Sequence, residues 1–393
     1  MSINHDCALG RLTAHARGIV SADLIADREL LPHPIRIADQ VWPDGTIPTV
    51  SICCITYNHV SFIREAIEGF LAQETTFPVE ILVHDDASSD GTAEIVRDYQ
   101  AKFPRLIKAV LQTVNQYSQG VKPGVQTRSR AKGEFIAYCE GDDFWTDPRK
   151  LQKQVQLLDE HPNAIIAAHN VDGVDTAGNS VAIKGNDLGV NGKQVEFVTG
   201  DEVISGRHLP TLSILYRKRD IYVGKKGFRQ VTNGDRYLFS MLAVHGGAII
   251  SSERMAVYRV HECGVWSGAD WISQRRNKIH ARIAICLDIE PSHCLPACRH
   301  LAEVVWSSIH MGYREHRMVC CREFAPAFVF SLLFCFRSIQ AGVGFVPRLI
   351  ATQLRIAFIP VQFTAKVAIN KLKQRLSPGL AGGESSDCGS TRR

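Results

Sequence analysis

The sequence predicts an α/β fold in which a mostly parallel sheet is flanked by helices, with a helical appendage at the C-terminal end. Three observations support this fold class. Short apolar runs alternate with segments of helical spacing, polar clusters follow three of the runs, and turn signals become sparse beyond about residue 270. Such alternation is typical of domains in which helices cover both faces of a parallel sheet.

The composition is that of a globular protein. The chain has 393 residues, of which 45% are hydrophobic and 22% charged, enough for one large domain with an appendage or for two domains. A formal charge of +5 is too small to indicate a nucleic-acid surface, so no nucleic-acid partner is expected. The 12 cysteines follow no regular framework and several lie within apolar runs, which favours a reduced, cytoplasmic location.

Residues 1–47 are predicted to form a mixed N-terminal leader. They lack the basic start and apolar core of a signal peptide. Pro43, Gly45 and Pro48 then interrupt the chain before the first strong strand pattern. The organised domain is therefore expected over residues 48–270.

The first half of this domain contains repeated strand–helix units. The apolar run 50–56 predicts a buried strand, and apolar residues between 62 and 71 follow at helical spacing. The run 79–83 predicts the next strand, and residues 93–103 the next helix. Further strands are predicted at 106–111 and 135–139. Because parallel strands end at a common edge, the polar residues after three of them, Tyr57, Asp86 and Glu140, are expected on one rim.

The second half is less regular. Asp147, followed by Pro148, is expected to cap a helix. Residues 173–192 are rich in Gly and Asn and predict a loop, whereas 235–245 predict a helix and 248–260 a strand. Residues 271–376 are expected to be helical, and the Gly/Ser-rich residues 377–393 to be disordered.

The most informative motif is Glu140-Gly141-Asp142-Asp143. It places three carboxylates within four residues at a strand end, where a hard divalent cation such as Mn²⁺ or Mg²⁺ would offset their mutual repulsion. Gly141 would let phosphate oxygens approach the backbone. The alternative is an acidic, solvated turn, which is the more common meaning of such a motif in isolation.

Three segments of the chain resemble the family-two glycosyltransferases of the GT-A type. These segments are Val50-Ser51-Ile52-Cys53-Cys54-Ile55-Thr56-Tyr57-Asn58-His59, His84-Asp85-Asp86-Ala87-Ser88-Ser89-Asp90-Gly91-Thr92, and residues 131–151 around the acidic motif. They occur in the order and at the spacing of that family. The resemblance implies a nucleotide-binding α/β domain that uses a nucleoside-diphosphate-sugar donor and a glycan or lipid-linked acceptor.

The resemblance also implies roles for individual residues. Asp86 would accept from the base or bind the ribose of the donor, and Tyr57 would supply an aromatic face. Asp142 would bind the metal, and Asp143 the metal or the ribose. Glu140 stands where many relatives have the first Asp of their D-x-D triplet, and its longer side chain leaves its partner open.

Asp235 is the candidate general base, because inverting members of the family use an Asp to deprotonate the acceptor hydroxyl. The alternative is that Asp235 caps the helix that follows it. Residues 255–267 resemble the family's closing segment, in which Arg259 would neutralise phosphate and His261 would help to hold the metal. A lone histidine is more often structural, so the role of His261 depends on this resemblance.

Other functions are weaker matches. A nucleotidyltransferase would need a glycine-rich basic loop after the first strand, where Thr56-Tyr57-Asn58-His59 stands instead. A dehydrogenase would need a G-x-G-x-x-G motif after a strand, and none is present. A non-catalytic binding protein is disfavoured by the retained carboxylates. Zinc bound by His293, Cys294, Cys298 and His300 has an unusual ligand spacing.

The C-terminal region carries an uneven charge. Residues 324–383 contain seven basic residues and no acidic one. No apolar span reaches the roughly 20 residues of a transmembrane helix. Two interpretations remain open: a basic surface that contacts the cytoplasmic face of an anionic membrane, and a helical appendage packed on the domain.

Overall fold

The computed structural model describes residues 28, 30–183, 193–219, 221, 231, 234–262, 264, 266 and 268–314. Its strands are β1 (Ile35–Arg36), β2 (Val50–Thr56), β3 (Glu74–Thr75), β4 (Val79–Asp85), β5 (Ile107–Leu111), β6 (Phe135–Glu140), β7 (Phe144–Trp145), β8 (Ala164–Val174), β9 (Val195–Val198), β10 (Leu215–Arg217) and β11 (Gly247–Arg259). Its α-helices are α1 (Ile63–Leu71), α2 (Thr92–Lys102), α3 (Pro123–Arg130), α4 (Lys150–Glu160), α5 (Gly200–Ile204), α6 (Asp235–Ala243), α7 (Trp271–Asp288) and α8 (Cys294–Arg314).

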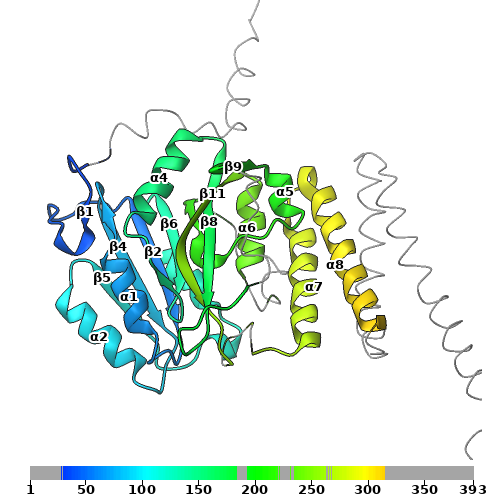
Figure 1. Cartoon of the computed structure of the whole chain (residues 1–393), viewed down its shortest axis with the longest axis horizontal. Coiled ribbons are helices and arrows are strands. Elements are labelled where there is room, and N and C mark those ends of the chain that lie inside the picture. The colour runs from blue at the N-terminus through cyan, green and yellow to red at the C-terminus, as the bar shows by residue number, and fades with distance from the viewer. Residues whose placement is uncertain are drawn as a thin grey trace, which may run out of the picture.

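A single large sheet organises these elements (Figure 1). In the described part of the chain its order is β5-β4-β2-β6-β10-β8-β11-β7, with β9 paired to β11. The strands β5, β4, β2 and β6 are parallel, as the sequence predicts. The α/β class with flanking helices is therefore confirmed.

The sheet becomes mixed beyond β6. The three residues of β10 run antiparallel to both β6 and β8, whereas β8 and β11 are parallel to each other. Strands β8, β9 and β10 are not among the predicted strands. The apolar run Ala164–Ala168 at the start of β8 would have indicated that strand, whereas β9 and β10 have only four and three residues, too few for a periodic pattern.

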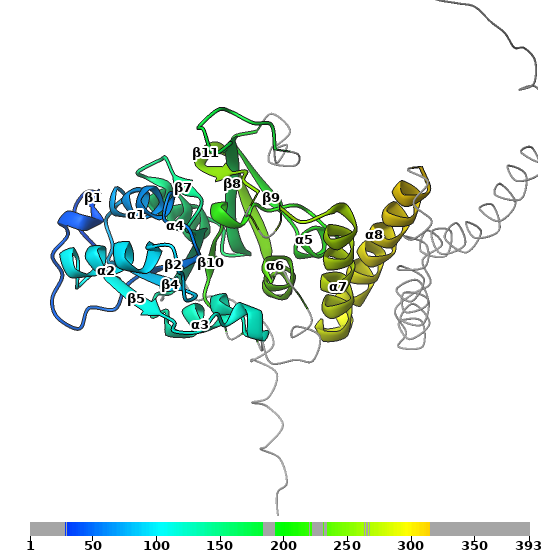
Figure 2. The ribbon, with the colours of Figure 1, turned by 90° about the horizontal axis from the view of Figure 1, so that it is seen from below.

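Two apolar cores lie on opposite faces of the sheet. Side chains alternate between them along β2: Ile52 and Cys54 join the core under α1, α2 and α4, and Cys53 joins the core under α5 to α8. Helices α6, α7 and α8 are packed one behind the other away from the sheet in both views (Figure 2). The buried faces of α7 and α8 belong to the same core as α6.

One predicted helix start is wrong. Helix α4 begins at Lys150, and its N-cap position is Arg149, not Asp147. The Asp147 carboxylate instead accepts from the Arg149 backbone N–H at 2.7 Å and from Lys153 Nζ at 2.8 Å. The side chain therefore closes a local turn before the helix, a competing use that Asp favours.

Part of the predicted leader contacts the sheet domain. Strand β1 pairs with β3, and the guanidinium of Arg28 bridges Glu134 and Asp159 at 3.0 and 2.5 Å.

At the other end of the described chain, the Asp270 side chain caps α7 by accepting from two backbone N–H groups. Among the described helices, none combines the length and apolarity that crossing a membrane requires. The basic segment 324–383 and the tail 377–393 lie outside the described residues.

Lys150, the first residue of α4, has a fully buried side chain. Its Nζ donates to Gln154 Oε1 at 2.7 Å and lies 4.0 Å from the centre of the Trp145 ring. Burial lowers the pKa of Lys150 to about 7. Between pH 7 and about 10.4, the unfolded chain therefore binds a proton that the folded chain does not, and the free energy of unfolding rises with pH.

We expect Lys150→Met to be more stable than the wild type at pH 7, by about 2 kcal/mol, because the variant buries no cation. This advantage should shrink as the pH approaches 10. Urea unfolding at several pH values between 6.5 and 9.5 measures it, with the exposed Lys132→Met as the control. Parallel stability profiles for the wild type and Lys150→Met would contradict the expectation.

Candidate functional site

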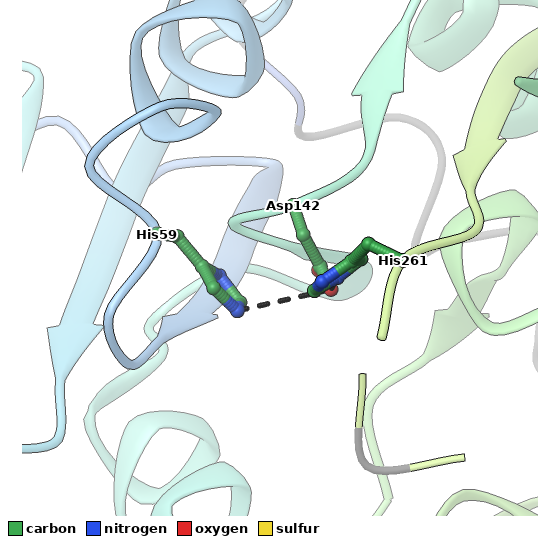
Figure 3. Close-up of side chains that lie close together, drawn as sticks. All are labelled: His59, Asp142 and His261. Carbon is green, nitrogen blue, oxygen red and sulfur yellow. Dashed lines mark hydrogen bonds and ion pairs between the residues drawn. The ribbon is translucent and has the colours of Figure 1, made fainter. Parts of the chain in front are cut away.

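The residues predicted for one rim, Tyr57, Asp86 and Glu140, stand at the ends of the parallel strands β2, β4 and β6, which finish at the same edge of the sheet. Loops after β2, β6 and β11 bring His59, Asp142 and His261 together (Figure 3). These loops are adjacent because β2 and β6 are parallel neighbours whose carboxyl ends point the same way. Strand β11 lies at the same edge because it pairs with β7, the short strand that directly follows the acidic motif in the chain.

Asp142 is the centre of this group. Its Oδ2 lies 2.9 Å from His261 Nε2 and 3.7 Å from His59 Nε2. Its Oδ1 is buried and has no hydrogen-bond partner among the described residues. Burial alone would favour the neutral acid, but the His261 hydrogen bond and the nearby His59 outweigh it and lower the pKa of Asp142.

Glu140 ends β6. Part of its side chain is exposed, but desolvation of the carboxyl is the largest effect on it and, together with the charges of Asp142 and Asp235, raises the pKa of Glu140 to about 8. Asp235, the candidate base, is thus one of the charges that act on Glu140.

Asp143 points into the protein. It is 2% exposed, and its Oδ1 accepts from the Arg259 backbone N–H at 2.8 Å. Burial and the charges of Asp142 and Glu140 raise the pKa of Asp143 well above its usual value. In this arrangement Asp143 joins the acidic loop to the end of β11.

Arg259 is also held by protein groups. Its Nε donates to the Asp142 carbonyl at 3.0 Å, and its guanidinium pairs with Glu65. The same group lies 4.8 Å from the Phe62 ring centre and 5.3 Å from that of Phe144. Arg259 therefore fixes the backbone of the acidic loop, whereas its predicted contact with phosphate stays a prediction.

The space beside Gly141 is occupied by protein. A Cβ at this position would lie 2.6 Å from Thr56 Oγ1 and 3.0 Å from Ile63 Cδ1. The glycine thus admits the Thr56 side chain from β2. The expectation that phosphate oxygens approach the backbone at Gly141 stays a prediction.

Asp86 and Tyr57 differ in solvent exposure and in hydrogen bonding to the protein. Asp86 is 2% exposed and accepts from the backbone N–H groups of Gln116 and Tyr117 at 2.8 and 3.0 Å, which fixes the loop before α3. Tyr57 is 45% exposed at the end of β2. Its ring is therefore accessible to a planar ligand, as a stacking role requires.

Asp235 occupies the first turn of α6 but does not cap it. The N-cap position is Gly234, without a side-chain cap, and Asp235 Oδ1 accepts from the N–H of the next residue, Arg236. Its other oxygen, Oδ2, accepts from Thr211 Oγ1 at 3.1 Å. A half-buried carboxylate held from two sides is suited to accept a proton at a defined position.

His59 is the residue that sequence reasoning missed as a candidate ligand. It lies at the end of the first family-like segment, and nothing in the local sequence pattern distinguishes it from an ordinary loop histidine. The turn at Asn58, whose φ is 55°, and the bond from the His59 N–H to Thr92 Oγ1 direct it toward Asp142. Burial lowers the pKa of His59, with Asp142 acting in the opposite direction.

Two groups of side chains on the described part of the chain could hold a divalent cation. One consists of His59, Asp142 and His261, and the other of Glu140, Asp142 and Asp143, with the ligand atoms of each group within 4.8 Å of one another. The buried, unpartnered Oδ1 of Asp142 fits a missing electropositive partner. Neither group includes Cys294 or Cys298, so the described residues give no support to the zinc alternative.

The comparisons with known proteins agree with this architecture. Residues 51–200 match the model of the family described as glycosyl transferase family 2. An uncharacterized protein of Mycobacterium tuberculosis is 38% identical over 226 residues, which are 56% of this chain and 61% of that protein. An uncharacterized glycosyltransferase of Nostoc sp. is 29% identical over 126 residues, which are 32% of this chain and 37% of the relative.

Among solved structures, S. aureus TarS 1-349 in complex with UDP-GlcNAc has a TM-score of 0.51 at 22% identity, covering 71% of this chain and 81% of that one. This similarity shows a shared fold. The chain spans about three fifths of the length of the mycobacterial relative. Residues 51–200 of this chain are therefore similar to glycosyl transferase family 2, and the chain shares its fold with S. aureus TarS.

Proposed function

We propose that this chain is an inverting, metal-assisted glycosyltransferase. It would move a sugar from a nucleoside-diphosphate-sugar donor to a hydroxyl of a glycan or lipid-linked acceptor. The observation that supports this most strongly is the meeting of Asp142 with two imidazoles at the edge where the parallel strands β2 and β6 end. A donor bound between these groups would present its anomeric carbon to the acceptor.

The transfer needs one proton acceptor. Asp235 would take the proton of the acceptor hydroxyl as the acceptor oxygen forms its bond to the anomeric carbon. The bond between that carbon and the diphosphate oxygen breaks on the opposite face, and the nucleoside diphosphate leaves with the electron pair. Attack from the opposite face inverts the anomeric configuration. The hydrogen bond from Thr211 would keep the Asp235 carboxylate oriented.

The donor would be held along the same edge. Tyr57 would stack on the base, and Asp86 would bind the base or the ribose with lone pairs left by its two backbone contacts. Arg259 would orient the acidic loop and contribute positive charge near the diphosphate. Asp143 and Glu140 are further candidates for the ribose or the metal.

A divalent cation, Mn²⁺ or Mg²⁺, would be held by Asp142 and His261, with Asp143 as a further candidate. Bound there, it would offset the negative charge of the departing diphosphate. The residues present fit such an ion, because Asp142 has a buried oxygen without a described partner.

A donor screen tests the proposal. A donor that binds the folded chain raises its unfolding temperature by mass action, so UDP-, GDP- and dTDP-sugars are compared by thermal shift with Mn²⁺ or Mg²⁺. Release of nucleoside diphosphate from the stabilising donor, sensitive to chelator, is the expected result. Tight donor binding without turnover on any acceptor would favour the non-catalytic alternative, and release of pyrophosphate would favour a nucleotidyltransferase.

We further propose that the basic segment 324–383 contacts an anionic membrane surface at the cytoplasmic face, where a lipid-linked acceptor would be found. The full-length protein should then sediment with vesicles containing anionic lipid, and less so at high salt. A variant with all seven basic residues of the segment replaced by Gln should stay in the supernatant. Equal sedimentation of both proteins would contradict the membrane contact.

A further inference from the structure

Three loops that are distant in sequence present nitrogen and oxygen ligands to one point. His59 follows β2, Asp142 follows β6 and His261 follows β11, and the three side chains converge in Figure 3. His261 Nε2 and His59 Nε2 both face Asp142 Oδ2, at 2.9 and 3.7 Å. The family resemblance supplied no role for His59, so its presence here requires an explanation.

Hydrogen bonding does not provide that explanation. Asp142 Oδ2 already accepts from His261, and His59 Nε2 lies beyond hydrogen-bond distance from it. Asp142 Oδ1 is buried without a hydrogen-bond partner among the described residues. Buried polar atoms normally have partners, so this carboxylate oxygen beside two imidazoles indicates that a binding partner belongs there.

The spacing fits a shared cation. Nitrogen and oxygen ligands lie about 2.0–2.2 Å from a transition-metal ion, so two of them on one ion are about 3 Å apart. The separations of 2.9 and 3.7 Å need only a small rotation of the His59 ring to reach that value. The surroundings restrict both rings, since Phe62 lies 5.3 Å from the His261 ring centre and 6.5 Å from that of His59.

We propose that His59 is a third protein ligand of the divalent cation, together with Asp142 and His261. The cation site then has two imidazoles and one carboxylate, and it selects Mn²⁺ or Co²⁺ over Mg²⁺, because nitrogen ligands favour transition metals. The purpose of the ion rests on the proposed transferase function, but its binding does not. The competing site would use Glu140, Asp142 and Asp143, which offer oxygen only and would suit Mg²⁺ equally well.

The test measures metal binding directly, on the full-length protein, with and without UDP or GDP. The loss of the free Mn²⁺ electron paramagnetic resonance signal reports affinity, and the visible absorption of bound Co²⁺ reports nitrogen ligands. We expect His59→Gln to weaken Mn²⁺ binding about tenfold to a hundredfold, by comparison with losses on changing groups around metal ligands. His59→Asp should keep an ion bound but shift the Mn²⁺-to-Mg²⁺ affinity ratio toward Mg²⁺.

His245→Gln is the matched control, because His245 is an exposed histidine at the end of α6 and should leave binding unchanged. Thermal unfolding of each variant separates ligand loss from misfolding. Mn²⁺ affinity retained in folded His59→Gln but lost in Asp142→Asn would overturn the role of His59 while leaving the transferase proposal intact. A shift in metal preference on His59→Asp supports the role, since a purely structural histidine would not change it.

Discussion

Replacing Asp142 with Asn should lower kcat/KM for sugar transfer by about a hundredfold or more, because a preorganised charge that supports the transition state is lost. Asp142 is the one residue shared by both groups that could hold a cation among the described side chains. Asn keeps the size of the side chain and its contact with His261, so the fold should be retained. The measurement is the initial rate of nucleoside diphosphate release over a range of donor and metal concentrations.

The exposed Asp98→Asn on α2 is the control for the loss of one carboxylate. Raising the Mn²⁺ concentration should recover part of the Asp142→Asn activity if the variant fails by weak metal binding. Full activity of Asp142→Asn in the presence of chelator would refute the metal-assisted mechanism.

Asp235→Asn should lower kcat by about a hundredfold to ten-thousandfold, the usual range for loss of a general base, with little change in donor affinity. The amide cannot accept the hydroxyl proton, but it can still interact with Thr211 and the Arg236 N–H. Single-turnover rates and calorimetric titration of the donor separate the two effects.

Asp201→Asn is a matched control, because Asp201 also lies in the first turn of a helix, α5, and is exposed. Thr211→Val should give a smaller loss than Asp235→Asn, because it removes only the group that orients the carboxylate. A normal rate for Asp235→Asn would assign the base elsewhere on the rim.

The parts of the fold that were predictable are those with strong local patterns. Strands β2, β4 and β6 are apolar runs, and their parallel arrangement places their ends on one edge, so the position of Tyr57, Asp86 and Glu140 at that edge followed from the strand assignments. Strand β10 has only three residues, and its place in the sheet comes from pairing with β6 and β8 rather than from a local pattern, whereas β8 does begin with an apolar run that a closer reading of the sequence could have used.

In the candidate site too, residues in local motifs were predictable, and residues placed by distant contacts were not. The acidic motif and His261 were predicted because the family-like segments include them. The orientation of His59 toward Asp142, in contrast, depends on the positive φ of Asn58 and on the hydrogen bond to Thr92, which the sequence does not show. Likewise, the clamp made by Arg259 on the Asp142 carbonyl joins residues more than a hundred positions apart. Contacts of that range carry no signal in one sequence.

The insertion of β10 between β6 and β8 has a consequence for how the protein folds. Leu215 pairs with Ala137, so this strand can join the sheet only after a long loop has closed, whereas the βα units of the first half form from neighbouring segments. Closing long loops is the slow part of folding. The part of the sheet that contains β10, and helix α6 with Asp235 that follows it in the chain, are therefore expected to form after β2, β4 and β6 have paired.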